Sequence, residues 1–225
     1  MTNTLAFDVY GTLIDTNGVV IALQKLVGDK AAEFSKVWRE KQLEYTFRRG
    51  LMRRYLDFSV CTQDALNFTC TALKIDLTKA DKQTLIDAYR VLPVFGDVVD
   101  ALDDLSTADY RLYAFSNGKA EAVKSLLKHA GILHYFIDVI SVDEIKTFKP
   151  DPAVYHHLLK RCDSRAESSW LISGNAFDVM GAKSAGLKGA WLQRTANAVY
   201  DPWKDLSADV TISSLIDLDA AIKNG

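Results

Sequence analysis

One stretch near the start of the chain places a carboxylate, a glycine and a hydroxyl in the order that nucleophilic chemistry needs. Between positions 7 and 13, Asp8 follows a short apolar run and is followed closely by Gly11 and Thr12. A carboxylate at the carboxyl end of a buried parallel strand lies where open α/β sheets bind their ligands. Such a carboxylate can attack an electrophile and form an ester. The alternative interpretation is a solvated aspartate in an Asx turn.

Three later stretches supply the other groups that this chemistry requires. Lys149 lies just before a helical pattern, and its ammonium would orient Asp8 and keep that carboxylate charged. Asp178 would activate water for hydrolysis of an ester. Taken singly, Lys149 also fits a solvated surface lysine, and Asp178 fits an acid favoured at a helix N-terminus. The neutral hydrogen-bonding side chains in these stretches are Ser116, Asn117, Ser173 and Asn175.

Strand-like apolar runs precede these polar groups. Residues 5–7, 111–115 and 169–172 are apolar enough for buried strands, and each run ends on polar residues with a glycine nearby. Because the carboxyl ends of parallel strands meet at one edge of a sheet, we expect Asp8, Ser116 and Asp178 to converge there. This convergence is the main physical reason to predict an active site.

The remaining patterns predict an α/β fold: a doubly wound, mostly parallel, Rossmann-like sheet with a small helical insert. Residues 19–89 show only helical periodicity, so we expect an all-helical cap domain inserted after the first strand. The predicted boundaries are a core of residues 1–15 and 94–225 and a cap of residues 16–93. The core should alternate strands and helices with right-handed crossovers. Its other predicted elements are helices over 98–105, 120–130, 152–162 and 179–185 and strands over 136–141, 189–193 and 208–212.

Bulk composition excludes several function classes. A formal net charge of -2 gives no electrostatic reason to expect nucleic acid or an anionic membrane as partner. Neither a membrane-spanning apolar run nor a signal peptide is visible, so we expect a cytoplasmic protein. The three cysteines, Cys61, Cys70 and Cys162, lack metal-ligand spacing and are expected to be buried free thiols.

Taken together, the motifs resemble those of the haloacid dehalogenase superfamily, and more narrowly those of the L-2-haloacid dehalogenases. The similarity extends over essentially the whole chain and includes the segment from Trp38 to Thr46 in the predicted cap. The ordered motifs are Asp8-x-Tyr10-Gly11-Thr12-Leu13, Ser116-Asn117-Gly118, Lys149-Pro150 and Ser173-x-Asn175-Ala176-x-Asp178.

The resemblance implies a reaction and a role for each polar residue. Asp8 would attack C2 of an (S)-2-haloalkanoic acid from the side opposite the halogen, so that hydrolysis of the ester yields the (R)-2-hydroxy acid. Arg39 and Asn117 would receive the halide, while Lys149 and Asn175 would orient Asp8 and the hydrolytic water. Without the resemblance, Arg39 reads as a surface helix charge. The residues with supporting roles would be Asp178 for water activation, Thr12, Tyr155 and Ser173 for hydrogen bonding, and Val9, Tyr10 and Ser116 for the substrate carboxylate.

The resemblance also predicts an apolar pocket for the alkyl group, formed by Tyr10, Leu43, Phe58 and Phe177, each of which also fits an ordinary core position. Three departures from the family pattern bear on this pocket. Phe177 and Gly174 replace residues that are commonly Trp and Ser, which leaves chain length and halogen open. Glu40, beside Arg39, would weaken anion binding unless it points to solvent.

Two other functions fit the same fold. A Mg²⁺-dependent phosphatase of the superfamily would need a second acid at position 10 and two acids in the last of the motifs, residues 173–178. Tyr10 is a poor acid at neutral pH, and Asn175 occupies a position where an acid often lies. We therefore expect no metal and no cofactor. A non-catalytic binding protein is the other alternative, because fold alone does not establish activity.

Basic residues gather on one predicted helix of the cap. Arg48, Arg49, Arg53 and Arg54 are read first as a solvated face and second as a field that attracts an anionic haloacid. Leu51 and Met52 beside them are a candidate contact between subunits, since the related enzymes are commonly homodimers.

Overall fold

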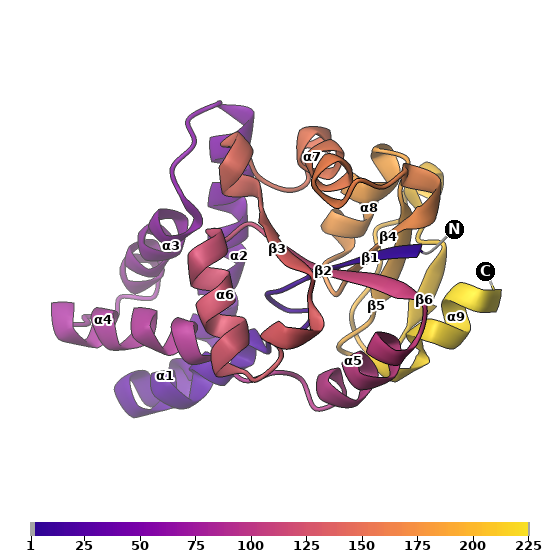
Figure 1. Ribbon diagram of the computed structural model, residues 1–225. Coiled ribbons are helices and arrows are strands. Elements are labelled where there is room, and N and C mark those ends of the chain that lie inside the picture. Colours follow the sequence, from indigo (N-terminus) through magenta and orange to yellow (C-terminus); the bar gives the residue numbers. More distant parts are fainter. Residues whose placement is uncertain (1–2, 225) are drawn as a thin grey trace.

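Strand β1 (Asn3–Asp8) lies in the middle of a parallel sheet whose strand order is β3-β2-β1-β4-β5-β6. The computed structural model describes residues 3–224, and helices cover both faces of this sheet (Figure 1). The order matches the doubly wound arrangement that the sequence predicts. The other strands are β2 (Tyr110–Ser116), β3 (Asp138–Ser141), β4 (Ser169–Ser173), β5 (Lys188–Leu192) and β6 (Val210–Ile212).

Side chains alternate between two buried clusters, one on each face of the sheet. Leu5 and Phe7 point into the larger cluster, and Ala6 points into the smaller one. This period of two buries both faces, as expected for a central parallel strand. The larger cluster is covered by α5 (Val98–Thr107), α6 (Ala120–His129) and α9 (Leu218–Asn224). The smaller cluster is covered by α7 (Pro152–Cys162) and α8 (Ala176–Ser184).

Register brings the polar strand ends to one edge of the sheet. Asp8 pairs with Phe115 on β2, so Ser116 lies just beyond it. Phe7 pairs with Ile172 on β4, which places Ser173 level with Asp8. Chain order reverses between β1 and β4, and a crevice at such a reversal is where open α/β sheets bind ligands. The predicted convergence of the strand ends is therefore observed.

All residues between the first strand and α5 that form regular structure are helical. The helices are α1 (Val19–Val27), α2 (Ala31–Leu51), α3 (Phe58–Ala72) and α4 (Lys79–Ala88), and they lie at the end of the sheet opposite α9 (Figure 1). The chain leaves and re-enters the sheet region through two paired connections. Asp15 N–H donates to the Pro93 carbonyl at 2.8 Å, and Phe95 N–H donates to the Leu13 carbonyl at 3.1 Å. The helical segment therefore joins the rest of the molecule at one narrow place.

Most predicted elements occur near their predicted positions, with three differences. Helix α8 begins at Ala176 rather than at residue 179, which places Asp178 inside its first turn. Strand β3 begins at Asp138 rather than at residue 136, because its pairing with β2 starts there, opposite Tyr113. Helix α9 was not predicted; its Leu218 and Ile222 fill the end of the larger cluster.

Two expectations about composition can also be compared with the structure. Cys61, Cys70 and Cys162 are buried free thiols, as predicted. In residues 3–224, none of the helices combines the length and the apolar character needed to cross a bilayer.

Candidate active site

The Asp8 carboxylate is buried at the end of β1 and accepts four hydrogen bonds. Among residues 3–224, its Oδ1 accepts only from Lys149 Nζ, at 3.0 Å. Its Oδ2 accepts from Asn175 Nδ2 at 2.7 Å, Thr12 Oγ1 at 2.8 Å and Ser173 Oγ at 3.2 Å. Burial opposes ionisation, but the charge and hydrogen bond of Lys149, with the Thr12 bond, outweigh it and hold the pKa of Asp8 below its usual value. Asp8 is therefore a charged carboxylate at neutral pH.

Lys149 is 2% exposed, so its interpretation as a solvated surface lysine is wrong. Its ammonium uses all three donors, to Asp8 Oδ1, to Asp178 Oδ2 at 2.8 Å and to the Phe115 carbonyl at 2.8 Å. Burial lowers the pKa of Lys149, but the charges of Asp178 and Asp8 more than compensate and raise it above its ordinary value. The site thus contains one buried cation shared by two buried carboxylates.

Asp178, the second carboxylate, differs from Asp8 in its ionisation. Its Oδ1 accepts from the Tyr155 hydroxyl at 2.7 Å, and its Oδ2 accepts from Lys149. Burial, offset in part by Lys149 and reinforced by repulsion from Asp8, raises the pKa of Asp178 to about 6. Two carboxylates whose pKa values are driven apart are suited to different roles in one reaction.

A small cavity lies against Asp8. Its accessible volume is about 10 Å³, which is close to the least space that holds one water molecule. Its walls are formed by Asp8, Tyr10, Arg39, Leu43, Phe58, Ser116, Asn117, Lys149, Asn175 and Phe177. All ten are residues that the sequence assigns to the site. We call this space the reaction cavity.

The remaining predicted site residues lie behind the cavity walls. Thr12, Tyr155, Ser173 and Asp178 are completely buried. Thr12 and Ser173 bond to Asp8, Asp178 bonds to Lys149, and Tyr155 bonds to Asp178. Val9 has its side chain in the larger buried cluster, so only its backbone is available to a ligand. Within residues 3–224, no three His, Cys, Asp or Glu side chains are grouped as a metal site would require.

Comparison with known proteins assigns the chain to a family. A model of the haloacid dehalogenase-like hydrolases matches residues 2–186. An (S)-2-haloacid dehalogenase of Pseudomonas sp. (strain YL) is 38% identical over 92% of this chain and 89% of its own length. The chain therefore belongs to the L-2-haloacid dehalogenase family of these hydrolases.

Two further family members are also similar over most of the chain. The haloacetate dehalogenase H-2 of Moraxella sp. (strain B) is 36% identical over 84% of this chain and 85% of its own length. The solved L-2-haloacid dehalogenase of Xanthobacter autotrophicus with covalently bound chloropropionic acid superposes with a TM-score of 0.88. It is 28% identical and covers 99% of each chain.

The guanidinium of Arg39 extends from α2 over the reaction cavity. One terminal nitrogen, Nη2, donates to the Tyr10 carbonyl at 3.2 Å, and the other, Nη1, donates to Gln42 Oε1 at 2.7 Å. Arg39 is also close enough to Asp8 to contribute to the lowering of that pKa. The cation predicted to receive the halide and the predicted nucleophile therefore face one small space.

Gln42 and Thr62 form a support for Arg39 to which the family motifs gave no role. Gln42 is completely buried, and its Nε2 donates to Thr62 Oγ1 at 2.7 Å. Thr62 Oγ1 in turn donates to the Phe58 carbonyl at 2.9 Å. These bonds fix the amide so that its oxygen faces Arg39. The spacing of Arg39 and Gln42, three residues apart on one helix, was the available signal for their contact.

Neutral amides and hydroxyls at the strand ends complete the site. Asn117 Oδ1 accepts from the Lys149 backbone N–H at 3.1 Å, so its N–H groups are the part of the amide that can meet a ligand. Ser116 Oγ accepts from Gly118 N–H at 3.1 Å. This arrangement places donors beside Arg39 at the cavity wall, as binding of an anion requires.

The three departures from the family pattern have different structural consequences. Glu40 points away from the reaction cavity and has a side chain that is 64% exposed. Gly174 is not among the residues that line the cavity, and a Cβ there would collide with the Gly11 carbonyl. Phe177 does line the cavity and packs against Phe47 with ring centroids 5.0 Å apart.

Replacing the Arg39 support should affect the leaving group more than the fold. We expect Gln42→Leu to reduce kcat/KM for 2-chloropropionate about 5- to 30-fold, equivalent to the loss of about one to two hydrogen bonds. The reduction should be smaller for 2-bromopropionate, because bromide departs more readily and needs less help from Arg39. Thr46→Val, another buried polar position on α2, is the control and should leave the bromide-to-chloride ratio unchanged. An equal loss with both substrates would show that Gln42 has only a structural role.

The raised pKa of Asp178 predicts that kcat depends on pH on the acid side of neutrality. Below pH of about 6 the Asp178 carboxyl becomes protonated and can no longer accept a proton, so kcat should fall on the acid side of that value. Asp8 has a lowered pKa and should titrate well below this limb. The check is the pH profile of halide release by the wild type and by Asp178→Asn, whose residual rate should be flat there. The same limb in the variant would assign it to another group.

Proposed function

We propose that this protein hydrolyses short (S)-2-haloalkanoic acids to (R)-2-hydroxyalkanoic acids through an ester on Asp8. The observation that supports this most directly is the placement of a charged, buried Asp8 and the Arg39 guanidinium around one small cavity. The relatives named as (S)-2-haloacid dehalogenases, and the solved relative with covalently bound chloropropionic acid, fit the same chemistry.

The first step is a displacement at C2 of the substrate. Asp8 Oδ1 is the better nucleophilic oxygen, because it accepts one hydrogen bond whereas Oδ2 accepts three. It forms the new C–O bond from the side opposite the halogen. The carbon–halogen bond breaks, and the halide leaves with the electron pair toward Arg39 and Asn117. A halide needs no proton to leave, so a cation and N–H donors are sufficient.

The second step is hydrolysis of the ester at its carbonyl carbon. Water attacks Cγ of Asp8, the bond between Cγ and the ester oxygen breaks, and the hydroxy acid departs with that oxygen and one proton from water. Asp178, 2.8 Å from Lys149 and hydrogen-bonded by Tyr155, accepts the second proton. Asp8 regains its charge beside Lys149, so the site is restored. The ester oxygen carried away by the product originates from Asp8 in this scheme.

Substrate recognition follows from the remaining walls. The substrate carboxylate would bind to the backbone N–H groups of Val9 and Tyr10 and to Ser116. The alkyl group would lie among the side chains of Tyr10, Leu43, Phe58 and Phe177, which surround the cavity. The small volume favours short chains. The haloacetate dehalogenase among the relatives is consistent with such a preference.

The donor set disfavours a Mg²⁺-dependent phosphatase. Both carboxylates that would bind the ion, Asp8 and Asp178, are already hydrogen-bonded to the Lys149 ammonium, which would repel a dication. Tyr10 occupies the general-acid position, and burial raises its pKa to about 12. A phenol with that pKa is a poor proton donor to a leaving alcohol at neutral pH. A purely binding role would not account for two buried carboxylates that share the Lys149 ammonium.

Three broader predictions belong with this function. We propose that residues 16–93 form a cap domain over a core of residues 1–15 and 94–225, supported by the paired connections at Asp15 and Phe95. A homodimer remains a prediction, and the exposed Leu51 and Met52 on α2 and just after it are a candidate contact. A cytoplasmic location also remains a prediction.

The decisive assay measures chloride release from (S)-2-chloropropionate in EDTA. We expect turnover by the wild type and a loss of at least about 10³-fold in Asp8→Asn, because an amide is not a comparable nucleophile. Asp163→Asn is the matched control, since Asp163 is exposed and Asn tolerates its left-handed backbone. Circular dichroism verifies that both variants fold. Phosphate release from p-nitrophenyl phosphate that requires Mg²⁺, without chloride release, would favour the phosphatase instead.

A further inference from the structure

The reaction cavity is too small to admit a haloalkanoate without an opening, and two larger cavities adjoin it. One, which we call the corridor, has a volume of about 250 Å³ and shares Tyr10 and Phe58 with the reaction cavity. The other, the apolar cavity, has a volume of about 420 Å³ and shares Lys149 and Phe177 with it. Either cavity is a candidate route for the substrate. Charge distinguishes between them.

The corridor leads on to a wide basic depression on the surface. Asp57 and Lys119 line both the corridor and this depression, whose volume is about 720 Å³. We call it the basic basin. Its lining carries five cations against two carboxylates, although the whole chain has a net charge of -2. The lining residues are Arg49, Arg53, Arg54, Tyr55, Leu56, Asp57, Lys119, Asp143 and Lys146.

Part of this positive charge is compensated and part is not. Arg49 pairs with Asp64 at 2.9 Å, and Lys146 pairs with Asp143 at 3.0 Å. Neither Arg53 nor Arg54 forms an ion pair within residues 3–224. Local excess charge of one sign raises the concentration of small ions of the other sign. We therefore interpret Arg53 and Arg54 as a source of positive potential beside the corridor, and not merely as part of a solvated face.

The ion pair between Lys119 and Asp57 lies where the basic basin meets the corridor. Lys119 Nζ lies 3.1 Å from Asp57 Oδ2, with side-chain exposures of 49% and 22%. Asp57 caps the N-terminus of α3, and Lys119 precedes α6, so the pair joins the helical segment to the sheet region. An ion pair this exposed contributes little stability, so it opens readily. A carboxylate arriving from the basin can replace Asp57 as the partner of Lys119.

Opening this ion pair would act directly on the reaction cavity. Phe58 follows Asp57 in the chain and separates the corridor from the reaction cavity, where its ring lies 5.6 Å from that of Tyr10. Displacement of Asp57 therefore moves the wall residue next to it. Gly118, which precedes Lys119, donates to Ser116 at the predicted carboxylate site. The gate is thus adjacent in sequence to Phe58 of the reaction cavity on one side and two residues from Asn117 on the other.

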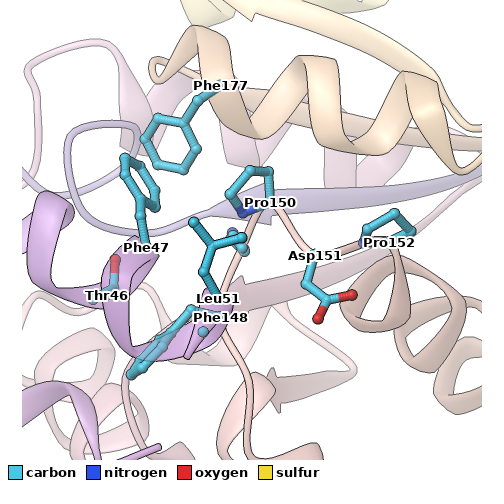
Figure 2. A pocket seen from close by; sticks show the side chains of 10 residues that line it. Thr46, Phe47, Leu51, Phe148, Pro150, Asp151, Pro152 and Phe177 are labelled. Carbon is cyan, nitrogen blue, oxygen red and sulfur yellow. The ribbon is translucent and has the colours of Figure 1, made fainter. Parts of the chain in front are cut away.

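The apolar cavity is a poorer path for an anion. Its walls include Phe47, Leu51, Phe148, Pro150 and Phe177, whose side chains surround the space in Figure 2. A carboxylate crossing it would lose its hydration and gain few polar partners, because the Lys149 ammonium is already bonded to Asp8, Asp178 and the Phe115 carbonyl. Asp151, at its rim, would also repel the substrate and both anionic products.

We propose that the anionic substrate reaches Asp8 from the basic basin, through a gate formed by the Lys119–Asp57 ion pair and the Phe58 wall. The ligand class is a small carboxylate, and the same path serves the departing hydroxy acid and halide. This inference rests on the proposed function, because it concerns access to the same site.

Paired blocking variants test which cavity is the route. Ala122 lines the corridor from an exposed position on α6, and Leu51 lines the apolar cavity with 86% of its surface exposed. We expect Ala122→Trp to lower kcat/KM for (S)-2-chloropropionate at least about fivefold, and Leu51→Trp to change it less than about twofold. The reverse pattern, or no effect of Ala122→Trp in a folded protein, would overturn the proposal.

Charge reversal provides an independent test should the bulky variant fail to fold. The double variant Arg53→Glu, Arg54→Glu should raise KM, leave kcat within about twofold and flatten the fall of kcat/KM with added salt. Lys160→Glu, Arg165→Glu is the matched control, located near the amino end of β4, away from Asp8. Equal effects of the two double variants on KM and on the salt dependence would contradict the role of the basic basin in substrate access. Failure of the wild type to release chloride would instead contradict the proposed function.

Discussion

The active site depends on one buried ammonium held between two buried carboxylates. Lys149 bridges Asp8, at the end of β1, and Asp178, in the first turn of α8, with hydrogen bonds of 3.0 and 2.8 Å. Removing one partner of a buried ion pair typically costs about 3–5 kcal/mol, because it leaves an uncompensated charge in a poorly hydrated site. The three groups therefore depend on one another. The parallel sheet brings the three side chains together, because the elements that carry them meet at one edge.

This shared cation also separates the two carboxylates in function. Asp8 receives four hydrogen bonds and has a lowered pKa, whereas Asp178 is deeper and has a pKa raised to about 6. A charged, oriented carboxylate suits nucleophilic attack, and a carboxylate that titrates nearer neutrality suits proton transfer. Because the same ammonium contacts both, formation of the ester on Asp8 would remove one negative charge beside Lys149 and alter the setting of Asp178. The two steps are electrostatically linked.

The helical segment contributes what the sheet edge cannot supply. Arg39 extends from α2 to the cavity opposite Asp8, and Gln42 and Thr62 fix its direction. The same segment carries Asp57 and Phe58, which lie at the proposed path for the substrate. The helical segment therefore shares the proposed anion binding and access with Asn117 and Lys119 of the sheet region, while the proposed nucleophile belongs to the sheet.

The sequence predicted those features whose causes are local. Apolar runs followed by polar residues identified the ends of β1, β2 and β4, and helical periodicity identified the insert. The start of α8 was placed three residues late, because Asn175 and Asp178 read as loop polarity rather than as a helix N-terminus. Gln42 received no role, since its importance arises from Thr62 on another helix. Glycine is needed at position 174 because a side chain there would meet the Gly11 carbonyl. The two residues are far apart in the chain, so the sequence does not reveal this contact.

The central claim is that the Asp8 carboxylate, held charged by Lys149, forms the bond to the substrate carbon. A single turnover of excess enzyme with (S)-2-chloropropionate in H₂¹⁸O tests it most directly. Mass spectrometry of the peptide that contains Asp8 should show ¹⁸O in its carboxylate, and the hydroxyl of the released hydroxy acid should be unlabelled. Label in that hydroxyl with an unlabelled Asp8 would mean that water attacks the substrate directly, which would contradict the account.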